Sequence, residues 1–158
     1  MISEASVAQA ILDFWFSAAC RPNWFAKDAA FDADLTARFQ PAWERAAAGG
    51  VADWAGSANA ALARVVLLDQ FPRNMFRGLP KAFSSDALAL AAAQDAVARS
   101  HDRAVAPERR LFLYLPYEHS EELDSQRQGY DLCAANIDWP EALTAAEIEF
   151  LLEPNSSF

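Results

Sequence analysis

Two segments of the sequence carry side chains that could do chemistry, and both segments share one layout. In each, an apolar stretch meets a proline and then turns polar: residues 67–74 read LLDQFPRN, and residues 113–121 read LYLPYEHSE. A proline removes a hydrogen bond from a helix and reorients the turn that follows, which is a common way to aim polar groups into a cleft. We therefore expect the two segments to face each other, with Asp69 near His119.

Eight side chains in and around these segments form a candidate site for a small polar or anionic ligand. They are Asp69, Gln70, Arg73, Asn74, Arg77, Arg110, His119 and Glu121. Arg73 and Arg77 would act as anion forks, because a guanidinium binds a carboxylate or phosphate through two parallel hydrogen bonds. At least one of the two is expected to turn donors toward a cleft. A purely structural role is the alternative, since Asp and Arg four residues apart on a helix commonly pair with each other.

Other chemistries find little support in the residues. His119 and Glu122 form a single i, i+3 pair, whereas helical carboxylate sites draw such pairs from several helices, so no metal is expected. Ser120 lacks the G-x-S-x-G context of a nucleophile elbow. The chain has neither a Walker A loop nor a GxGxxG motif, and no cofactor is expected. Cys20 and Cys133 have no metal or redox spacing and are predicted to be free, buried thiols. No reaction is assigned.

Composition restricts the partners. The chain of 158 residues carries 22 Asp and Glu against 13 Lys and Arg, a formal net charge of −9 at pH 7. This charge repels polyanions, so neither nucleic acid nor an anionic membrane is an expected partner. No apolar run approaches the roughly 18 residues that a membrane span requires, and no basic-then-apolar leader follows Met1. We expect a cytoplasmic protein.

The elements that must position the site are predicted to be helices. The chain holds 35 Ala but only 12 Val, Ile and Thr together, and Ala favours helices whereas β-branched residues favour strands. Caps and apolar spacing predict starts at Ser3 or Ser6, Asp28, Ser57, Ser84 or Ser85, Pro107, Glu118 and Thr144.

Two of these predicted helices bear directly on the site. The segment 60–68 is apolar on nearly all sides, which is typical of a central helix packed on several faces. Pro116 is expected to end one helix before a polar helix at 118–128, in which only Leu123 faces inward. We expect one domain over residues 1–158, all-α, with six or seven helices in stacked antiparallel hairpins.

The motifs resemble the bacterial family of uncharacterised proteins called DUF924. The resemblance rests on ILDFWF at 11–16, WF at 24–25, LLDQFPRNMFRG at 67–78 and YLPYEHSE at 114–121, and it covers nearly the whole chain from Val7. It implies a tetratricopeptide-like helical fold, in agreement with the stacked hairpins. It implies no activity, because the family has none established. By analogy with that fold, the alternative function is a scaffold whose groove binds a peptide or protein partner.

One part of the family's pattern is missing from this sequence. In the family, the His-Ser-Glu helix is followed by a basic stretch resembling HRDxxxRFGRFPHRN, and only then by the closing segment. Here residues 133–140 run almost straight into the closing segment at 144–158. If the family's site needs those arginines and histidines, this chain holds an incomplete site. A ligand cleft predicts that the eight candidate residues converge in one pocket, whereas a scaffold predicts an extended surface with exposed aromatic side chains.

Overall fold

The fold is all-α over the part of the chain that the structure, a computed structural model, describes: residues 4–137. Its helices are α1 (Glu4–Trp15), α2 (Ala29–Ala47), α3 (Ala58–Met75), α4 (Asp86–Ala98), α5 (His101–Ala104), α6 (Leu111–His119) and α7 (Leu123–Asn136). Short 3₁₀ turns lie between them: η1 (Arg21–Asn23), η2 (Ala52–Gly56), η3 (Pro80–Phe83) and η4 (Pro107–Arg109). No strand occurs within these residues. The predicted all-α class is confirmed.

Local chemistry sets several helix ends where the sequence predicts them. The Asp28 side chain accepts a hydrogen bond from the backbone N–H of Phe31, and Ser57 caps α3 in the same way through the N–H of Ala60. Such side chains satisfy amides that have no partner within the helix. Beyond the end of α2, Gly49 has a φ of +86°, which glycine adopts without steric strain.

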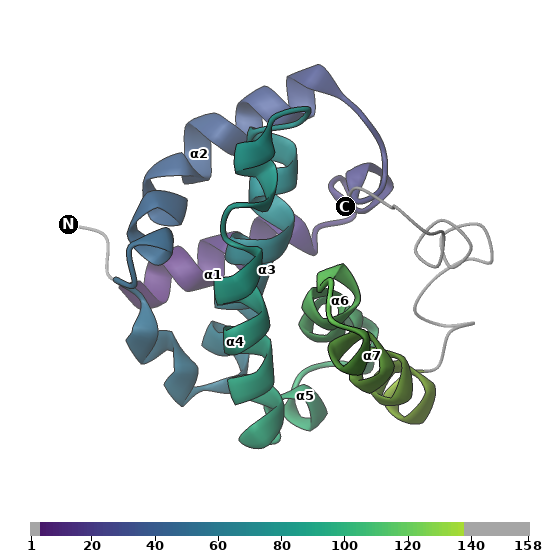
Figure 1. The fold of residues 1–158 in the computed structure, drawn as a ribbon. Helices are drawn as coiled ribbons and strands as arrows, with labels where there is room; N and C mark the ends of the chain where they lie inside the picture. The colour runs from purple at the N-terminus through teal and green to yellow at the C-terminus, as the bar shows by residue number, and fades with distance from the viewer. Residues whose placement is uncertain (1–3, 138–158) are drawn as a thin grey trace.

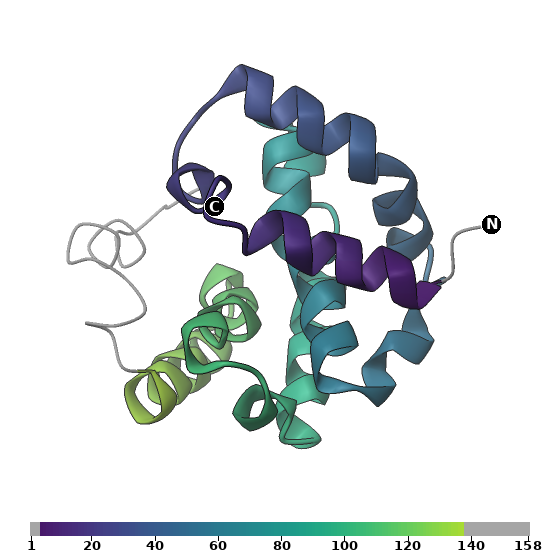
Figure 2. The same cartoon turned by 180° about the vertical axis from the view of Figure 1, so that it is seen from behind.

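Helix α3 is the centre of the molecule, as its apolar composition predicts. It packs against α1, α2, α4 and α6 (Figure 1), and from behind it is crossed by α1 (Figure 2). Leu62, Val66 and Phe71 are fully buried. Because its neighbours cover it on several sides, the buried polar side chains of α3 must find their partners inside the protein.

An aromatic cluster fixes the N-terminal part of the chain to α3 and α6. The Trp15 ring lies 5.6 Å from that of Phe71 and 5.7 Å from that of Phe112, between ring centroids. Trp24 packs edge-on to Phe112 at 4.8 Å, and its indole N–H donates to the carbonyl of Trp15 at 2.8 Å. These contacts hold the end of α3 and the start of α6 at fixed positions.

The prediction for the last described hairpin is wrong in two respects. Pro116 does not end its helix but lies inside α6, which continues to His119. Leu123 does not face inward: it is 59% exposed. The inner face of α7 is instead made of small residues four apart, Ser125, Gly129 and Cys133.

Small side chains let α7 approach α6 closely. A Cβ atom at Gly129 would lie 2.6 Å from the Cβ of Tyr117, a distance that leaves room only for hydrogen. The pattern of large apolar residues therefore could not reveal this face of the helix.

Some sequence predictions are not tested by the described residues. The helix expected after Thr144 and the shortened junction at 133–140 lie wholly or partly outside residues 4–137. The tetratricopeptide-like stacking of the hairpins stays a prediction. Among the described helices, none is both long and apolar enough to cross a membrane.

Candidate functional site

The C-terminal half of α3 carries four polar side chains that are almost completely buried. Asp69 is 0% exposed, Gln70 1%, and Arg73 and Asn74 6% each. Burying polar groups is unfavourable unless they are hydrogen-bonded, and burying charges is strongly so unless they are paired. The partners of these four residues therefore define the site.

His119, the last residue of α6, meets Asp69 from across the core. The imidazole Nδ1 lies 2.8 Å from Asp69 Oδ1, while Gln70 Nε2 donates to Asp69 Oδ2 at 2.9 Å. The prediction that the two segments face each other is confirmed. Both helices continue through their prolines, Pro72 and Pro116, so helix faces rather than reoriented turns present the polar groups.

Electrostatics favour the ionised form of Asp69. Burial alone would raise the pKa of this carboxyl, but the charges of His119 and Arg73 act against it, as do the hydrogen bonds from His119 and Gln70. The pKa of Asp69 consequently lies below its ordinary value. The core therefore holds a carboxylate at neutral pH.

Arg73 is held in a fork by a residue that the sequence analysis did not single out. Its Nη1 and Nη2 donate to the two carboxylate oxygens of Asp86 at 2.7 and 3.0 Å, and Nη1 also donates to the carbonyl of Asp69 at 2.7 Å. The guanidinium carbon lies 5.2 Å from the centroid of the Phe83 ring. Burial opposes the charge on Arg73, but the carboxylates of Asp69 and Asp86 raise its pKa. Its Nε is buried without a hydrogen-bond partner among the described residues.

A second carboxylate, Asp32 of α2, holds Arg77 and Asn74. Arg77 donates to Asp32 through Nε at 2.7 Å and Nη2 at 3.2 Å, and Asn74 Nδ2 donates to Asp32 Oδ1 at 2.9 Å. Nη2 of Arg77 also reaches the carbonyl of Ala26 at 3.3 Å. Its Nη1 has no partner within residues 4–137, and the side chain is 32% exposed. Arg73 and Arg77, the two predicted anion forks, are thus each bound to a carboxylate, and Arg77 retains the N–H donors of its Nη1.

A pocket of about 550 Å³ opens beside the two arginines. Its lining residues are Lys27, Arg73, Arg77, Gly78, Leu79, Pro80, Ala82 and Phe83. Three of these side chains are cationic, and none is acidic. Leu79 and Phe83 are 56% and 46% exposed, so apolar surface lies next to the charges. We call this feature the cationic pocket.

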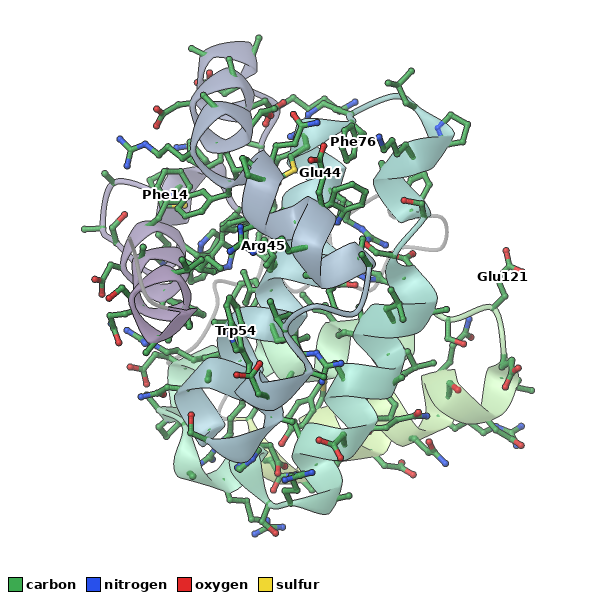
Figure 3. The ribbon with its side chains drawn as sticks, turned by 90° about the vertical axis from the view of Figure 1, so that its left-hand side faces the viewer. Phe14, Glu44, Arg45, Trp54, Phe76 and Glu121 are labelled. Atoms are coloured by element: carbon green, nitrogen blue, oxygen red, sulfur yellow. The ribbon has the colours of Figure 1, made fainter. Side chains whose placement is uncertain are left out.

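Two candidate residues lie elsewhere. Arg110 precedes α6, at the opposite end from His119, and a nine-residue helix spans about 13 Å. There it donates to the carbonyls of Asp102 and Asn136 at 2.8 and 3.2 Å. Glu121 is exposed and points away from the protein (Figure 3). α6 ends at His119 and the backbone of Ser120 is extended, so Glu121 leaves the helical face on which the sequence placed it.

Six of the eight predicted residues lie in two hydrogen-bonded groups, one of Asp69, Gln70, Arg73 and His119 and one in which Asp32 holds Asn74 and Arg77. Only Arg73 and Arg77 of the eight line the cationic pocket, so the eight residues do not converge there. Three residues of the site were not predicted from the sequence: the two counter-ions, Asp32 and Asp86, and Lys27. The only signals for the counter-ions are local ones, an acidic residue in the first turn of α2 and another in that of α4. Within the described range, no group of three or more His, Cys, Asp or Glu side chains is arranged to hold a metal ion.

The chain is similar to proteins whose function is unknown. A family described as bacterial protein of unknown function (DUF924) matches residues 11–155. A solved structure of a protein of unknown function from Agrobacterium tumefaciens is 41% identical, with a TM-score of 0.81. That match covers 84% of this chain and 75% of the Agrobacterium chain. No curated protein matches the sequence.

Proposed function

Since the chain belongs to the DUF924 family of bacterial proteins of unknown function, we propose its function from the site alone: it binds a small anionic ligand in the cationic pocket. The observation that carries this proposal is the lining, which holds Lys27, Arg73 and Arg77 and no acidic residue. The lining of this pocket is cationic although the protein as a whole carries a net charge of −9. Complementary charge in a pocket concentrates ligands of the opposite sign.

The available donors suit a carboxylate or a phosphate. Arg77 has both N–H groups of Nη1 to offer, and Lys27 forms no ion pair within residues 4–137. The bond from Arg77 to the carbonyl of Ala26 also ties the arginine to the residue next to Lys27. The Arg77 guanidinium is thus held beside the backbone of Lys27, and both side chains line the pocket in which an anion would bind.

The buried network behind the pocket supports this role by fixing the position of Arg73. Asp86 and the carbonyl of Asp69 hold its guanidinium from two sides, and His119 in turn holds the Asp69 carboxylate. A side chain fixed before the ligand arrives loses little freedom on binding. Asp69 and His119 therefore act as positioning residues for the pocket.

The same counter-ions limit the affinity. Asp32 and Asp86 offset two of the three positive charges, so an inorganic ion alone should bind weakly. Apolar contact with Leu79 and Phe83 would supply the remaining binding free energy. The ligand should therefore be an anion with an apolar group attached. The scaffold alternative uses the same exposed pair: a peptide could place its terminal carboxylate in the pocket and extend across Leu79 and Phe83.

We expect the protein to act in the cytoplasm and not to bind nucleic acid. Cys20 and Cys133 are both free and buried, as suits a protein in a reducing compartment. The net charge of −9 opposes binding of a polyanion outside the pocket. Neither point assigns a reaction, and the proposal is one of binding.

The test is calorimetric titration at constant ionic strength with phenyl phosphate, inorganic phosphate and neutral benzyl alcohol. We expect phenyl phosphate to bind most tightly and benzyl alcohol not to bind at the pocket. Lys27→Gln and Arg77→Gln should each weaken phenyl phosphate binding at least about fivefold, the loss of one charge-assisted contact. Arg99→Gln is the matched control, because Arg99, which follows α4, is an exposed arginine that pairs with Asp95 and is not part of the pocket lining.

Two results would contradict the proposal. One is equal binding of phenyl phosphate and benzyl alcohol. The other is a loss in Arg99→Gln as large as in the pocket variants, which would indicate non-specific attraction to surface charge. A tripeptide ending in Phe, binding far more tightly than phenyl phosphate and losing affinity in Arg77→Gln, would favour the scaffold alternative.

A further inference from the structure

A second pocket, of about 590 Å³, lies between α1 and α2 and has the opposite character. Its lining residues are Ala10, Asp13, Phe14, Ser17, Ala19, Cys20, Phe31, Asp34, Arg38 and Phe39. This volume is in the range of pockets that hold small molecules. The lining differs from that of the cationic pocket in its three aromatic rings and two carboxylates. We call it the aromatic pocket.

The aromatic walls come from the two helices that form the pocket. The Phe14 ring of α1 stacks on that of Phe31 with centroids 5.6 Å apart and meets Phe39 of α2 edge-on at 5.2 Å. Phe14 is labelled in Figure 3, which looks onto the side of the molecule that carries α1 and α2. Phe14 and Phe31 are only partly buried, so ring surface is open to a ligand. The face of an aromatic ring attracts cations through its quadrupole.

A cation of the chain itself already occupies part of this pocket. The guanidinium carbon of Arg38 lies 5.4 Å from the centroid of the Phe14 ring, and Arg38 Nε donates to Asp34 Oδ1 at 3.1 Å. The pocket therefore offers a positive group both an aromatic face and a carboxylate. The two side chains of this ion pair are 58% and 52% exposed, and exposed pairs of neighbouring helical residues are weak. Little free energy is therefore needed for a ligand to displace Arg38 from the pocket.

The charges of the lining also favour a cation. Asp13 and Asp34 face one basic residue, Arg38, and when Arg38 swings out into solvent the lining keeps two carboxylates. Asp13 accepts one hydrogen bond, from Gln9 at 2.8 Å, and retains its second carboxylate oxygen. The overall negative charge of the protein adds to the attraction.

We propose that the aromatic pocket binds a small organic cation of the substituted-ammonium class. The ammonium group sits against Phe14 with its charge toward Asp34, in the place that the Arg38 guanidinium takes in the free protein. The ligand and Arg38 compete for one position. This site is independent of the cationic pocket, since the two linings share no residue.

Choline is the probe, and its neutral isostere 3,3-dimethylbutan-1-ol, in which carbon replaces the ammonium nitrogen, is the control compound. Titration followed by NMR should show choline shifting the ring resonances of Phe14 and Phe31 with saturation, while the isostere causes a shift at least fivefold smaller at equal concentration. Arg38→Gln should tighten choline binding about two- to fivefold, because removal of a weak cation–π contact and ion pair removes the competitor. Asp34→Asn should weaken choline binding by a similar factor.

The chain provides a matched control for each variant. Asp95 of α4 and Arg99, the residue that follows this helix, form the same kind of i, i+4 pair at 3.0 Å, with side chains 41% and 53% exposed. Arg99→Gln and Asp95→Asn change the net charge identically and should leave choline binding within about 1.5-fold of the parent. Equal shifts from choline and its isostere would overturn the proposal. So would weaker binding in Arg38→Gln, since Arg38 would then be part of the site rather than its competitor.

Discussion

The carboxylate of Asp69 should make a large contribution to stability, and Asp69→Asn tests it with almost no change of shape. In the native protein Asp69 Oδ1 faces the His119 imidazole and Oδ2 accepts from Gln70. Arg73 Nη1 lies 3.6 Å from Oδ1. An asparagine keeps one oxygen but puts an N–H₂ group where the other oxygen stood, opposite an existing donor. The substitution also removes the negative charge.

The magnitude follows from burial and from what each partner retains. Removing one member of a buried ion pair costs about 3–5 kcal/mol, because the remaining charge stays buried without compensation. Arg73 keeps its two-pronged contact with Asp86 after the substitution, so the lower end of that range applies. We expect Asp69→Asn to lose about 3 kcal/mol, a large part of the roughly 5–15 kcal/mol that stabilises a domain.

The difference in unfolding free energy between the parent and Asp69→Asn should also change with pH in one direction. The pKa of Asp69 is lower in the folded protein than its ordinary value of 3.8. The stabilisation by its charge is therefore complete above the unfolded pKa and is lost as the pH falls through the lower, folded pKa. The difference in unfolding free energy between parent and Asp69→Asn should thus be constant near neutral pH and should shrink below about pH 4.

Urea unfolding followed by tryptophan fluorescence measures both effects, with Asp95→Asn as the control. Asp95 belongs to an exposed ion pair, and its substitution should change stability by less than about 1 kcal/mol. The reasoning fails if Asp69→Asn also loses less than about 1 kcal/mol at pH 7. It fails as well if the gap between the parent and Asp69→Asn widens as the pH is lowered toward 3, because that is the sign for a carboxyl whose folded pKa is raised.

Three further predictions concern the core. Trp43 is 5% exposed, and Trp43→Ala should reduce the unfolding free energy by about 3–5 kcal/mol in urea titrations. Gly129→Ala puts a Cβ 2.6 Å from that of Tyr117 and should cost about 1–3 kcal/mol by overpacking the α6–α7 contact. Burial raises the pKa of the Cys20 and Cys133 thiols to about 12, so a thiolate-specific reagent should modify neither in the native protein at pH 7 and both after unfolding.

Each of these predictions has a distinct opposing result. A loss below about 1 kcal/mol in Trp43→Ala would mean that Trp43 lies outside the core. Gly56→Ala is the control for Gly129, since a Cβ at Gly56 meets nothing within 4 Å; equal losses in the two variants would remove the packing explanation. Rapid modification of a native thiol at pH 7 would contradict the burial of Cys20 or Cys133.

The sequence alone predicted the parts of the fold that depend on local chemistry. Side-chain caps at Asp28 and Ser57 mark the starts of α2 and α3, and each operates through an amide only three residues away. The all-round apolar surface of α3 indicated its central place because such a surface needs neighbours on several sides. The facing of Asp69 and His119 was also predicted, from two apolar helices that each turn polar after a proline.

Packing by small residues could not be predicted in the same way. Leu123 appeared as the one apolar residue of a polar helix, yet α7 turns Ser125, Gly129 and Cys133 toward α6. Two helices approach closely only where the side chains between them are small, and small side chains do not contribute to the hydrophobic pattern of a sequence. The prediction for Glu121 is wrong for a different reason: it belongs to the helix predicted at 118–128, whereas α6 ends at His119 and α7 begins at Leu123, so Glu121 lies in the connection between them.

The charge pairing of the site shows why local spacing fails where a residue has two possible partners. Asp69 and Arg73 are four apart, the spacing of the alternative in which they pair with each other, and their side chains approach to 3.6 Å, but Arg73 forms its two short side-chain bonds with Asp86. A guanidinium fork binds most strongly to a carboxylate that accepts from two of its nitrogens, and Asp86 does so from the start of another helix. Asp32 meets Arg77 in the same way across 45 residues of sequence. Because tertiary contacts select the counter-ions, they also decide which guanidinium donors remain unused, and the proposed anion binding rests on the donors that remain on Arg77.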